Sequence, residues 1–227
     1  MGKVLDLLLI EIGNIPQFKG EIIVVDNNSS DDTALIANER GVRVVFEPIN
    51  QISRARNRGV VEANGENLIF LDADTEVSHE LLKLALDTLD SQQSGGGGST
   101  LMFDSNQNQF ILGTLVPRFW SWISKTFKLA AGSFIFCRKE IFQKIGGFSE
   151  KLFAGEEILF SQQLKKECKM NGLKFLIFDE FPVVTSSRKL EWYSSLRILM
   201  FIIIPIIFPW AVKFRTLCSF WYHRPKK

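Results

Sequence analysis

The sequence predicts an α/β fold with a mostly parallel central sheet, and two patterns carry this prediction. Short apolar or β-branched runs alternate with stretches of helical periodicity over residues 1–93. Such alternation is typical of parallel sheets with right-handed crossovers. The runs are continuously apolar, as in strands that are buried on both faces. The 227 residues are enough for one such domain and an appendage.

Each element follows from its composition and from signals at its ends. Gly13 ends the first helix, and a later helix has Ser53 as its N-cap and Gly65 after its last turn. The expected helices are 4–12, 34–39, 54–64, 79–93, 139–145 and 158–170. The expected strands are 21–25, 42–46, 68–71, 100–104, 134–138, 173–178 and 183–184.

Two stretches do not fit this alternation. Residues 94–99, Ser-Gly-Gly-Gly-Gly-Ser, have the composition of an engineered linker. Because strand-like sequence resumes at residue 100, we interpret them as a glycine-rich turn that lets backbone approach a ligand. They match neither common glycine motif for phosphate binding. The aromatic stretch 110–127 is compatible with a helix lining the acceptor side, a helix resting on lipid, or a core helix.

Two carboxylates follow the expected buried strand 68–71, at Asp72 and Asp74. Ligands of open α/β sheets bind beyond the carboxyl ends of the strands. In extended backbone, side chains two residues apart point the same way, and two converging carboxylates repel each other. A hard ion with oxygen ligands, Mg²⁺ or Mn²⁺, removes that cost. The structural alternative is that Asp72 caps the next turn and Asp74 is solvated.

Charged side chains near two helix starts form a second group of candidates. Arg54, Arg56 and Arg58 lie in the first half of a helix, where the helix dipole disfavours cations. They indicate either an anionic partner or a plain surface role. Glu156 and Glu157 stand at the start of a later helix, where the dipole alone explains acids. A carboxylate at a loop–helix junction is also a common position for a general base.

Composition excludes several classes of protein. The net charge of +2 does not indicate a nucleic-acid binder. The three cysteines form no Cys-x-x-Cys pair, which argues against a zinc site or a disulfide framework and fits a reducing compartment. The first residues lack the pattern of a signal peptide.

Five ordered segments together resemble a known family. They are 24–33, 56–59, 71–75, 146–148 and 155–157. In this order and spacing they are similar to the motifs of family 2 glycosyltransferases of the GT-A fold. The resemblance runs from about residue 3 to about residue 190, which we expect to form the catalytic domain, with residues 191–227 as a hydrophobic membrane-associating segment.

The resemblance implies a role for individual positions. Asp26 would recognise the nucleotide base, Asp72 would face the ribose, and Asp74 with Asp72 would hold Mg²⁺ or Mn²⁺ on the diphosphate. Glu157 would be the general base, with Glu156 as its neighbour. The implied donor-binding residues are Asp26, Asn28, Arg56, Asn57, Asp72 and Arg188. Of these, Arg188 (or the adjacent Lys189) is expected to reach the diphosphate from a closing loop.

The expected function is inverting transfer of a sugar from a UDP- or GDP-sugar to an acceptor hydroxyl, with lipid-linked acceptors and envelope glycans as candidates. Catalysis would need the metal and basic groups to offset leaving-group charge, and a carboxylate to take the acceptor proton. One alternative is a non-catalytic relic of the same fold that acts as a binding or scaffold protein. A nucleotidyltransferase is a weaker alternative, because no glycine-rich loop bearing Arg or Lys stands near the N-terminus.

The resemblance also shows one departure from the family pattern. Family members begin with a strand whose end contacts the nucleotide, whereas Met1 lies within what matches the first helix. Without a central strand, its neighbours carry unpaired backbone groups. We therefore expect the chain to be less stable, and to bind donor less tightly, than a form extended by that strand.

The C-terminal segment contains an uninterrupted apolar run, 198–212, with Pro205 and Pro209 inside it. As a helix this run would reach only about 22 Å, against roughly 30 Å of membrane hydrocarbon. Flanking aromatic and basic residues resemble an interfacial belt. We expect a monotopic or re-entrant membrane segment at the cytoplasmic face, with a tilted span and a buried helix pair as alternatives.

Overall fold

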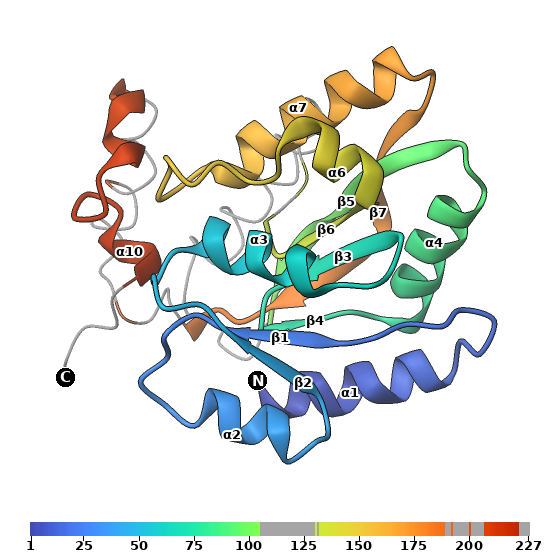
Figure 1. The fold of residues 1–227 in the computed structure, drawn as a ribbon, viewed down its shortest axis with the longest axis horizontal. Coiled ribbons are helices and arrows are strands. Elements are labelled where there is room, and N and C mark those ends of the chain that lie inside the picture. Colours follow the sequence, from blue (N-terminus) through green and yellow to red (C-terminus); the bar gives the residue numbers. More distant parts are fainter. Residues whose placement is uncertain (105–129, 131, 189–191, 193–199, 201–206, 223–227) are drawn as a thin grey trace.

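The computed structural model describes residues 1–104, 130, 132–188, 192, 200 and 207–222 (Figure 1). The helices in these ranges are α1 (Gly2–Gly13), α2 (Thr33–Asn38), α3 (Ile52–Glu62), α4 (His79–Asp90), α6 (Lys139–Ile145), α7 (Glu156–Met170), the 3₁₀ helix η1 (Pro209–Lys213) and α10 (Ser219–Tyr222). The strands are β1 (Ile23–Asp26), β2 (Arg43–Phe46), β3 (Asn67–Leu71), β4 (Thr75–Glu76), β5 (Ser94–Phe103), β6 (Phe134–Arg138) and β7 (Lys174–Thr185).

The described strands form two sheets rather than one. β1 and β2 pair in parallel, and the second sheet has the order β3-β6-β5-β7-β4. In that second sheet only β5 and β7 are parallel, while β6 runs antiparallel to both β3 and β5 and β4 runs antiparallel to β7. The α/β class is thus confirmed, but the expected predominance of parallel pairing is wrong for these strands. The alternation that predicts it ends near residue 93, and β6 then enters the sheet in the opposite direction.

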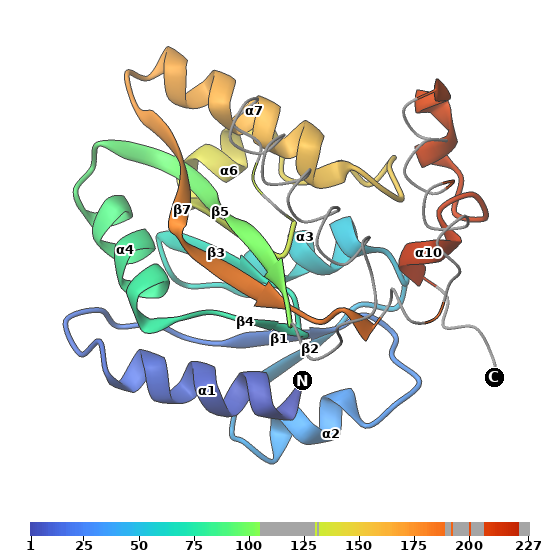
Figure 2. The same ribbon diagram turned by 180° about the vertical axis from the view of Figure 1, so that it is seen from behind.

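The glycine-rich stretch is the first half of strand β5, so the interpretation of a turn is wrong. β5 lies between β6 and β7, and it is buried from Ser94 to Thr100 (Figure 2). A Cβ atom on Gly97 would lie 1.9 Å from the backbone oxygen of Leu176, and one on Gly98 would lie 2.5 Å from the Cβ of Ala130. Glycine inside a strand marks such a close approach of neighbouring chain. These residues therefore permit tight packing in the sheet interior.

Helices cover both faces of the larger sheet and bury two apolar clusters. On one face, α3, α6 and α7 enclose a phenylalanine group in which the rings of Phe148 and Phe160 stack with centroids 4.0 Å apart. On the other face, Leu81 and Leu89 of α4 pack against Phe134 of β6. Stacked aromatic pairs add to the free energy gained by burying their area. The sheet edge that carries the site residues is thus held between two packed layers.

The third helix starts and ends earlier than its sequence signals indicate. Its N-cap is Gln51 and its C-cap is Ala63, whereas Ser53 is fully buried within the helix. The backbone N–H of Gln51 donates to Asn27, and its side-chain amide donates to the carbonyl oxygens of residues 150 and 152. These long-range bonds hold the chain at Gln51, so that tertiary contacts decide where the helix begins.

A cavity of about 990 Å³ separates the two sheets. Among the described strands, β1 pairs only with β2 and β3 pairs only with β6, and both line the cavity with residues such as Val24 and Ile69. The starts of the two strands lie close together, because Glu21 accepts a hydrogen bond from the backbone of Asn64 (2.6 Å). The lining is mostly apolar, and Met1 is part of it. The cavity is bounded by strands that each leave one edge unpaired.

The C-terminal region is described only in part. Residues 110–127 and most of the apolar run 198–212 lie outside the described residues, as does the expected domain boundary near residue 190. Within the described part, none of the helices combines the length and apolar character needed to cross a bilayer. Residues 207–222 lie beside the loop that precedes α7, where the N–H of Phe153 donates to the carbonyl of Val212 (2.7 Å).

We predict that a strand joined ahead of Met1 will stabilise the fold. An extension of about five β-branched residues and a short loop should enter the cavity and pair with β1 and β3. Each kcal/mol gained should raise Tm by about 2–4 °C for a chain of this size. Hydrogen exchange should show new protection of the β1 and β3 amides, and donor affinity should rise. A glycine–serine extension of equal length is the control, and equal Tm, exchange and donor affinity for the two would contradict the prediction.

Candidate active site

The two strand-end acids lie in the tight connection between β3 and β4. The N–H of Asp72 donates to the carbonyl of Ser133 (3.2 Å), and the carbonyl of Asp72 accepts from the N–H of Thr75 (3.0 Å). The carbonyl of Asp74 accepts from Ser186 (3.2 Å), which brings the loop after β7 beside the acids. The Asp72 side chain is 46% exposed. Asp72 therefore presents a solvent-accessible carboxylate at the end of a core strand, as expected from the sequence.

Arg56 of α3 connects this strand end with the start of α7. Its Nη2 lies 3.2 Å from Oδ1 of Asp72 and 2.8 Å from the carbonyl oxygen of Gly132. Its Nη1 lies 3.1 Å from Oε1 of Glu156, and its guanidinium stands 5.0 Å from the centroid of the Phe148 ring. The side chain is only 10% exposed. Burial acts to lower the pKa of Arg56, but the neighbouring carboxylates more than offset this effect, so the pKa lies above its ordinary value.

The two glutamates at the start of α7 have different surroundings. Glu156 is almost fully buried and ion-paired to Arg56, whereas Glu157 is partly buried. Burial, with the negative charge of Glu156, raises the pKa of Glu157 to about 8, although the charge of Arg56 opposes this rise. A carboxyl group that titrates near neutral pH is suited to accept a proton during catalysis. Glu156, by contrast, has an ion-pair partner that holds it in place.

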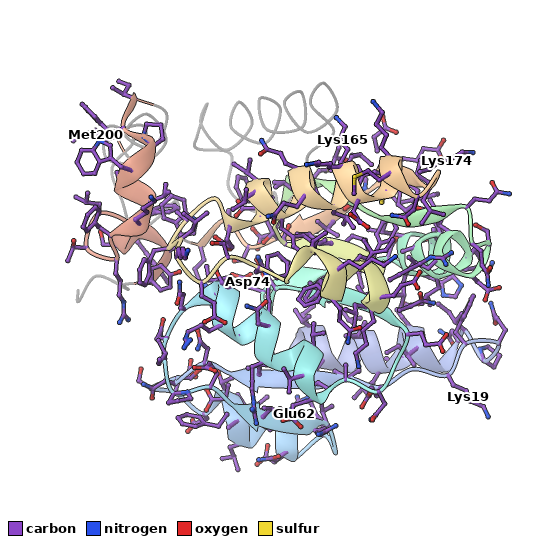
Figure 3. All side chains as sticks on the ribbon, turned by 45° about the horizontal axis from the view of Figure 1, so that its top comes forward. Lys19, Glu62, Asp74, Lys165, Lys174 and Met200 are labelled. Atoms are coloured by element: carbon purple, nitrogen blue, oxygen red, sulfur yellow. The ribbon has the colours of Figure 1, made fainter. Side chains whose placement is uncertain are left out.

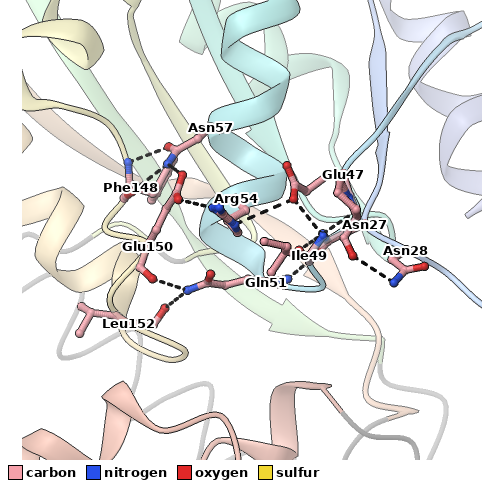
Figure 4. Close-up of polar contacts among 11 residues, drawn as sticks. Asn27, Asn28, Glu47, Ile49, Gln51, Arg54, Asn57, Phe148, Glu150 and Leu152 are labelled. Carbon is pink, nitrogen blue, oxygen red and sulfur yellow. Dashed lines mark hydrogen bonds and ion pairs between the residues drawn. The ribbon is translucent and has the colours of Figure 1, made fainter.

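A polar network fixes the loop after α6 to α3 (Figure 4). Asn57 accepts from the N–H of Phe148 and donates to its carbonyl, both at 2.9 Å. Asn57 also donates to Glu150 (3.0 Å), which Arg54 contacts at 2.6 Å. Gly147 has a φ of +73°, and a Cβ atom there would lie 2.8 Å from Oδ1 of Asn57. The network thus holds the Phe148 ring against Arg56.

The expected base-recognition loop is shaped by its own contacts. Oδ1 of Asp26 accepts from the N–H of Ser29 (2.9 Å). Asn28 has a positive φ of 56° and donates to the carbonyl of Pro48 (3.1 Å). Ser29 lines the same cavity as Arg56 and Asp72. The loop therefore borders the site, but no described contact joins Asp26 or Asn28 to Arg56.

The structure brings together some of the residues singled out in the sequence and not others. Asp72, Arg56 and Glu156 are in direct contact, and Glu157 lies beside them. Arg188 lies on the loop beside Asp74, where its N–H donates to Ser186 (3.3 Å), and Lys189 falls outside the described residues. Sequence reasoning missed Gln51, Glu150 and the role of Gly132. Only the glycine pair at 146–147 signalled a constrained loop here.

The carboxylates fit a hard divalent ion, although the ligand set is small. Asp72 and Asp74 offer only oxygen ligands, and one Asp72 oxygen faces Arg56 while the side chain is half-exposed. In the described part of the chain there is no cluster of three or more potential ligands drawn from His, Cys, Asp and Glu. Mg²⁺ and Mn²⁺ sites of this kind take one or two carboxylates and complete the shell with water and substrate phosphate. A phosphate-bearing ligand would thus be part of the metal site.

Comparisons with known proteins agree with this geometry. A family model described as Glycosyl transferase family 2 matches residues 9–146. Glycosyltransferase AglE of Haloferax volcanii is 26% identical over 161 residues, which cover 65% of this chain and 52% of AglE. The chain therefore spans about half the length of that relative. The alignment with AglE covers more residues of this chain than the five motif segments contain.

Two solved structures share the fold. Glucosyl-3-phosphoglycerate synthase of Mycobacterium tuberculosis, crystallised with Mn²⁺, UDP and phosphoglyceric acid, has a TM-score of 0.61 at 15% identity, covering 95% of this chain and 74% of that one. Mannosyltransferase PcManGT of Pyrobaculum calidifontis, crystallised with GDP-Man and Mn²⁺, has a TM-score of 0.56 at 18% identity, covering 80% and 53%. At these identities the likeness establishes the GT-A fold alone.

Proposed function

Because the chain belongs to glycosyl transferase family 2, we propose that it moves a sugar from a nucleotide-sugar donor to an acceptor hydroxyl with inversion at the anomeric carbon. One observation carries the proposal: Arg56 joins the strand-end carboxylate Asp72 to the acidic pair of α7. A metal and diphosphate at the strand end would then lie close to a carboxyl group able to take a proton. Transfer to a hydroxyl uses both the metal-bound leaving group and the proton-accepting carboxyl group.

The roles within the site follow from the chemistry of the transfer. Asp74 with Asp72 would hold Mg²⁺ or Mn²⁺, and a bound ion of this kind offsets the charge of a diphosphate leaving group. Glu157 takes the proton of the acceptor hydroxyl while the hydroxyl oxygen bonds to the anomeric carbon. The bond from that carbon to the diphosphate breaks, and the nucleoside diphosphate leaves. Asp26, Asn28, Asn57 and Arg188 remain predicted donor contacts or supports of the donor site.

The donor is proposed to be a UDP- or GDP-sugar. The solved relatives carry UDP in one case and GDP-Man in the other, each with Mn²⁺. The net charge of +2 gives no support for a nucleic-acid ligand. In the view of Figure 3, Asp74 lies near the centre, between α7 above it and α3 below it. That position suits a ligand bound across the sheet edge.

We predict that nucleotide binding depends on the metal and on Asp74. Calorimetric titration of UDP, then of GDP, should show binding in Mn²⁺ to one of them and little without the ion. Asp74→Ala should abolish the metal-dependent part. Asp87→Ala is the matched control, because Asp87 is an exposed carboxylate of α4 that pairs with Lys83. Metal-independent binding, or unchanged binding by Asp74→Ala, would refute the metal role of Asp74.

A non-catalytic binding protein is the alternative function. The cavity between β1 and β3 favours it, because the loop that follows β1 borders the donor site and one edge of β1 pairs with none of the described strands. The same titration separates the two functions. A folded chain that binds neither nucleotide, even with the strand extension described above, would be a scaffold rather than an enzyme.

We further propose that the protein works at the cytoplasmic face of a membrane and uses a lipid-linked acceptor or an envelope glycan precursor. Support comes from an exposed group of apolar side chains next to Lys213 and Arg215. Its members are Ile207, Phe208, Trp210, Phe214 and Leu217. Figure 3 shows Met200, also exposed, on the same C-terminal side. Aromatic groups with neighbouring cations suit an anionic lipid surface.

We predict that the chain co-sediments with vesicles containing phosphatidylglycerol, and less so in high salt because screening weakens the attraction. Trp210→Ser with Phe214→Ser should release it. Leu35→Ser with Val61→Ser is the control, since these side chains are at least as exposed but lie on α2 and α3. Unchanged sedimentation of the Trp210 and Phe214 variant, or none of the wild type, would count against membrane association.

A further inference from the structure

The guanidinium of Arg56 donates hydrogen bonds to protein groups on both sides of the site. One terminal nitrogen contacts Glu156, and the other contacts Asp72 and the carbonyl oxygen of Gly132. The planar fork of arginine holds two carboxylates in a fixed relative geometry, whereas the rotatable donors of an ammonium group do not fix it. Arg56 thus binds one acid from the strand side and one from the helix side. With these partners in place, it is poorly placed to be a direct ligand of a donor phosphate.

The surroundings leave Arg56 little freedom to move. The Phe148 ring lies against one face of its guanidinium, and Asn57 fixes the backbone of Phe148. Gly132 closes the arrangement from another side, because a Cβ atom there would lie 3.3 Å from Cγ of Glu157 and 3.5 Å from Nη2 of Arg56. The same short piece of backbone therefore touches both Arg56 and Glu157. A shift of Arg56 would therefore change the positions of both Glu156 and Glu157.

We propose that Arg56 is a positioning residue for the transfer step: it ties Asp72 to Glu156, and so sets Glu157 at a fixed place relative to the donor end of β3. Glu156 is the anchor of this arrangement, and Glu157 is the acid left to accept the proton. The proposal rests on the proposed glycosyl transfer and refines it. It separates the two glutamates by role and gives Arg56 an indirect part in place of a donor contact.

The charges around Glu157 predict how its titration responds to substitution. Glu156 on α7 and Arg56 on α3 act on it directly. Asp72 lies beyond Arg56. Tyr222 and Cys218 of the C-terminal segment interact with Glu156. The negative charge of Glu156 raises the pKa of Glu157, and the positive charge of Arg56 lowers it. Neutralising Glu156 should therefore lower the pKa of Glu157, so that the base ionises at lower pH.

The test uses hydrolysis of the nucleotide sugar whose nucleotide binds in calorimetry, with kcat, KM and pH profiles for each variant. Arg56→Lys keeps the charge but loses the fork, so kcat should fall on the order of 10²-fold because the acids are misplaced. Its nucleotide Kd and the pH of its acidic limb should stay close to wild type. Glu156→Gln should move the acidic limb of kcat to lower pH. Arg58→Met, on the same helix and paired with Glu62 at the surface, should behave as wild type.

The double variant Arg56→Met with Glu156→Gln guards against misfolding, because it removes both partners of the buried pair and leaves neither charge alone. It should fold, bind nucleotide in Mn²⁺ and turn over slowly. Wild-type kcat in Arg56→Lys or in the double variant would overturn the proposal. So would a loss of nucleotide affinity in Arg56→Lys as large as its loss of kcat/KM, which would make Arg56 a donor contact. A wild-type chain that neither binds a nucleotide in Mn²⁺ nor hydrolyses its sugar ester would instead remove the proposed function, and this proposal with it.

Discussion

The buried guanidinium of Arg56 is the contact on which the site depends. It neutralises Glu156 at the start of α7 and contacts Asp72 at the end of β3, so two layers of the fold meet at one cation. Removing one partner of a buried ion pair typically costs about 3–5 kcal/mol, because the remaining charge is left uncompensated. The hydrogen bonds of Asn57 to Phe148 and Glu150 hold the Phe148 ring against this cation. The relative positions of Asp72 and Glu156 thus depend on how α3 packs against α7.

The order of elements over the first part of the chain was predictable because each apolar run is short and bounded by turn residues. Strand β3 and helix α4 show this most clearly, and the side chain of Ser78 accepts a capping bond from the N–H of Leu81. The first half of strand β5 was not predictable, since four consecutive glycines lack the side chains on which a strand pattern rests. Their role appears only when the neighbouring strands are present, where backbone oxygens occupy the space of a Cβ. Pairing direction was equally hidden, because it depends on a connection that carries no periodic signal.

The site was predictable where chemistry is local. Asp72 follows a buried strand, and Glu156 and Glu157 begin a helix, so sequence position alone marks them as candidates. The partners of Arg56 could not be inferred, since they lie far away in sequence and are set by packing. Asn57 illustrates the difference, because its amide contacts the backbone of Phe148, a residue far away in sequence. Among the described strands, β1 and β3 do not pair with each other, and the apolar cavity lies between them.

The account stands on direct displacement at the anomeric carbon with Glu157 as the proton acceptor. The most direct measurement is early-time proton NMR of the sugar released from, or transferred out of, an α-linked nucleotide sugar in Mn²⁺. The account predicts that the first product is the β-anomer, and that Glu157→Gln forms it far more slowly while still binding nucleotide. An α-anomer as first product, or full turnover by Glu157→Gln, would contradict it.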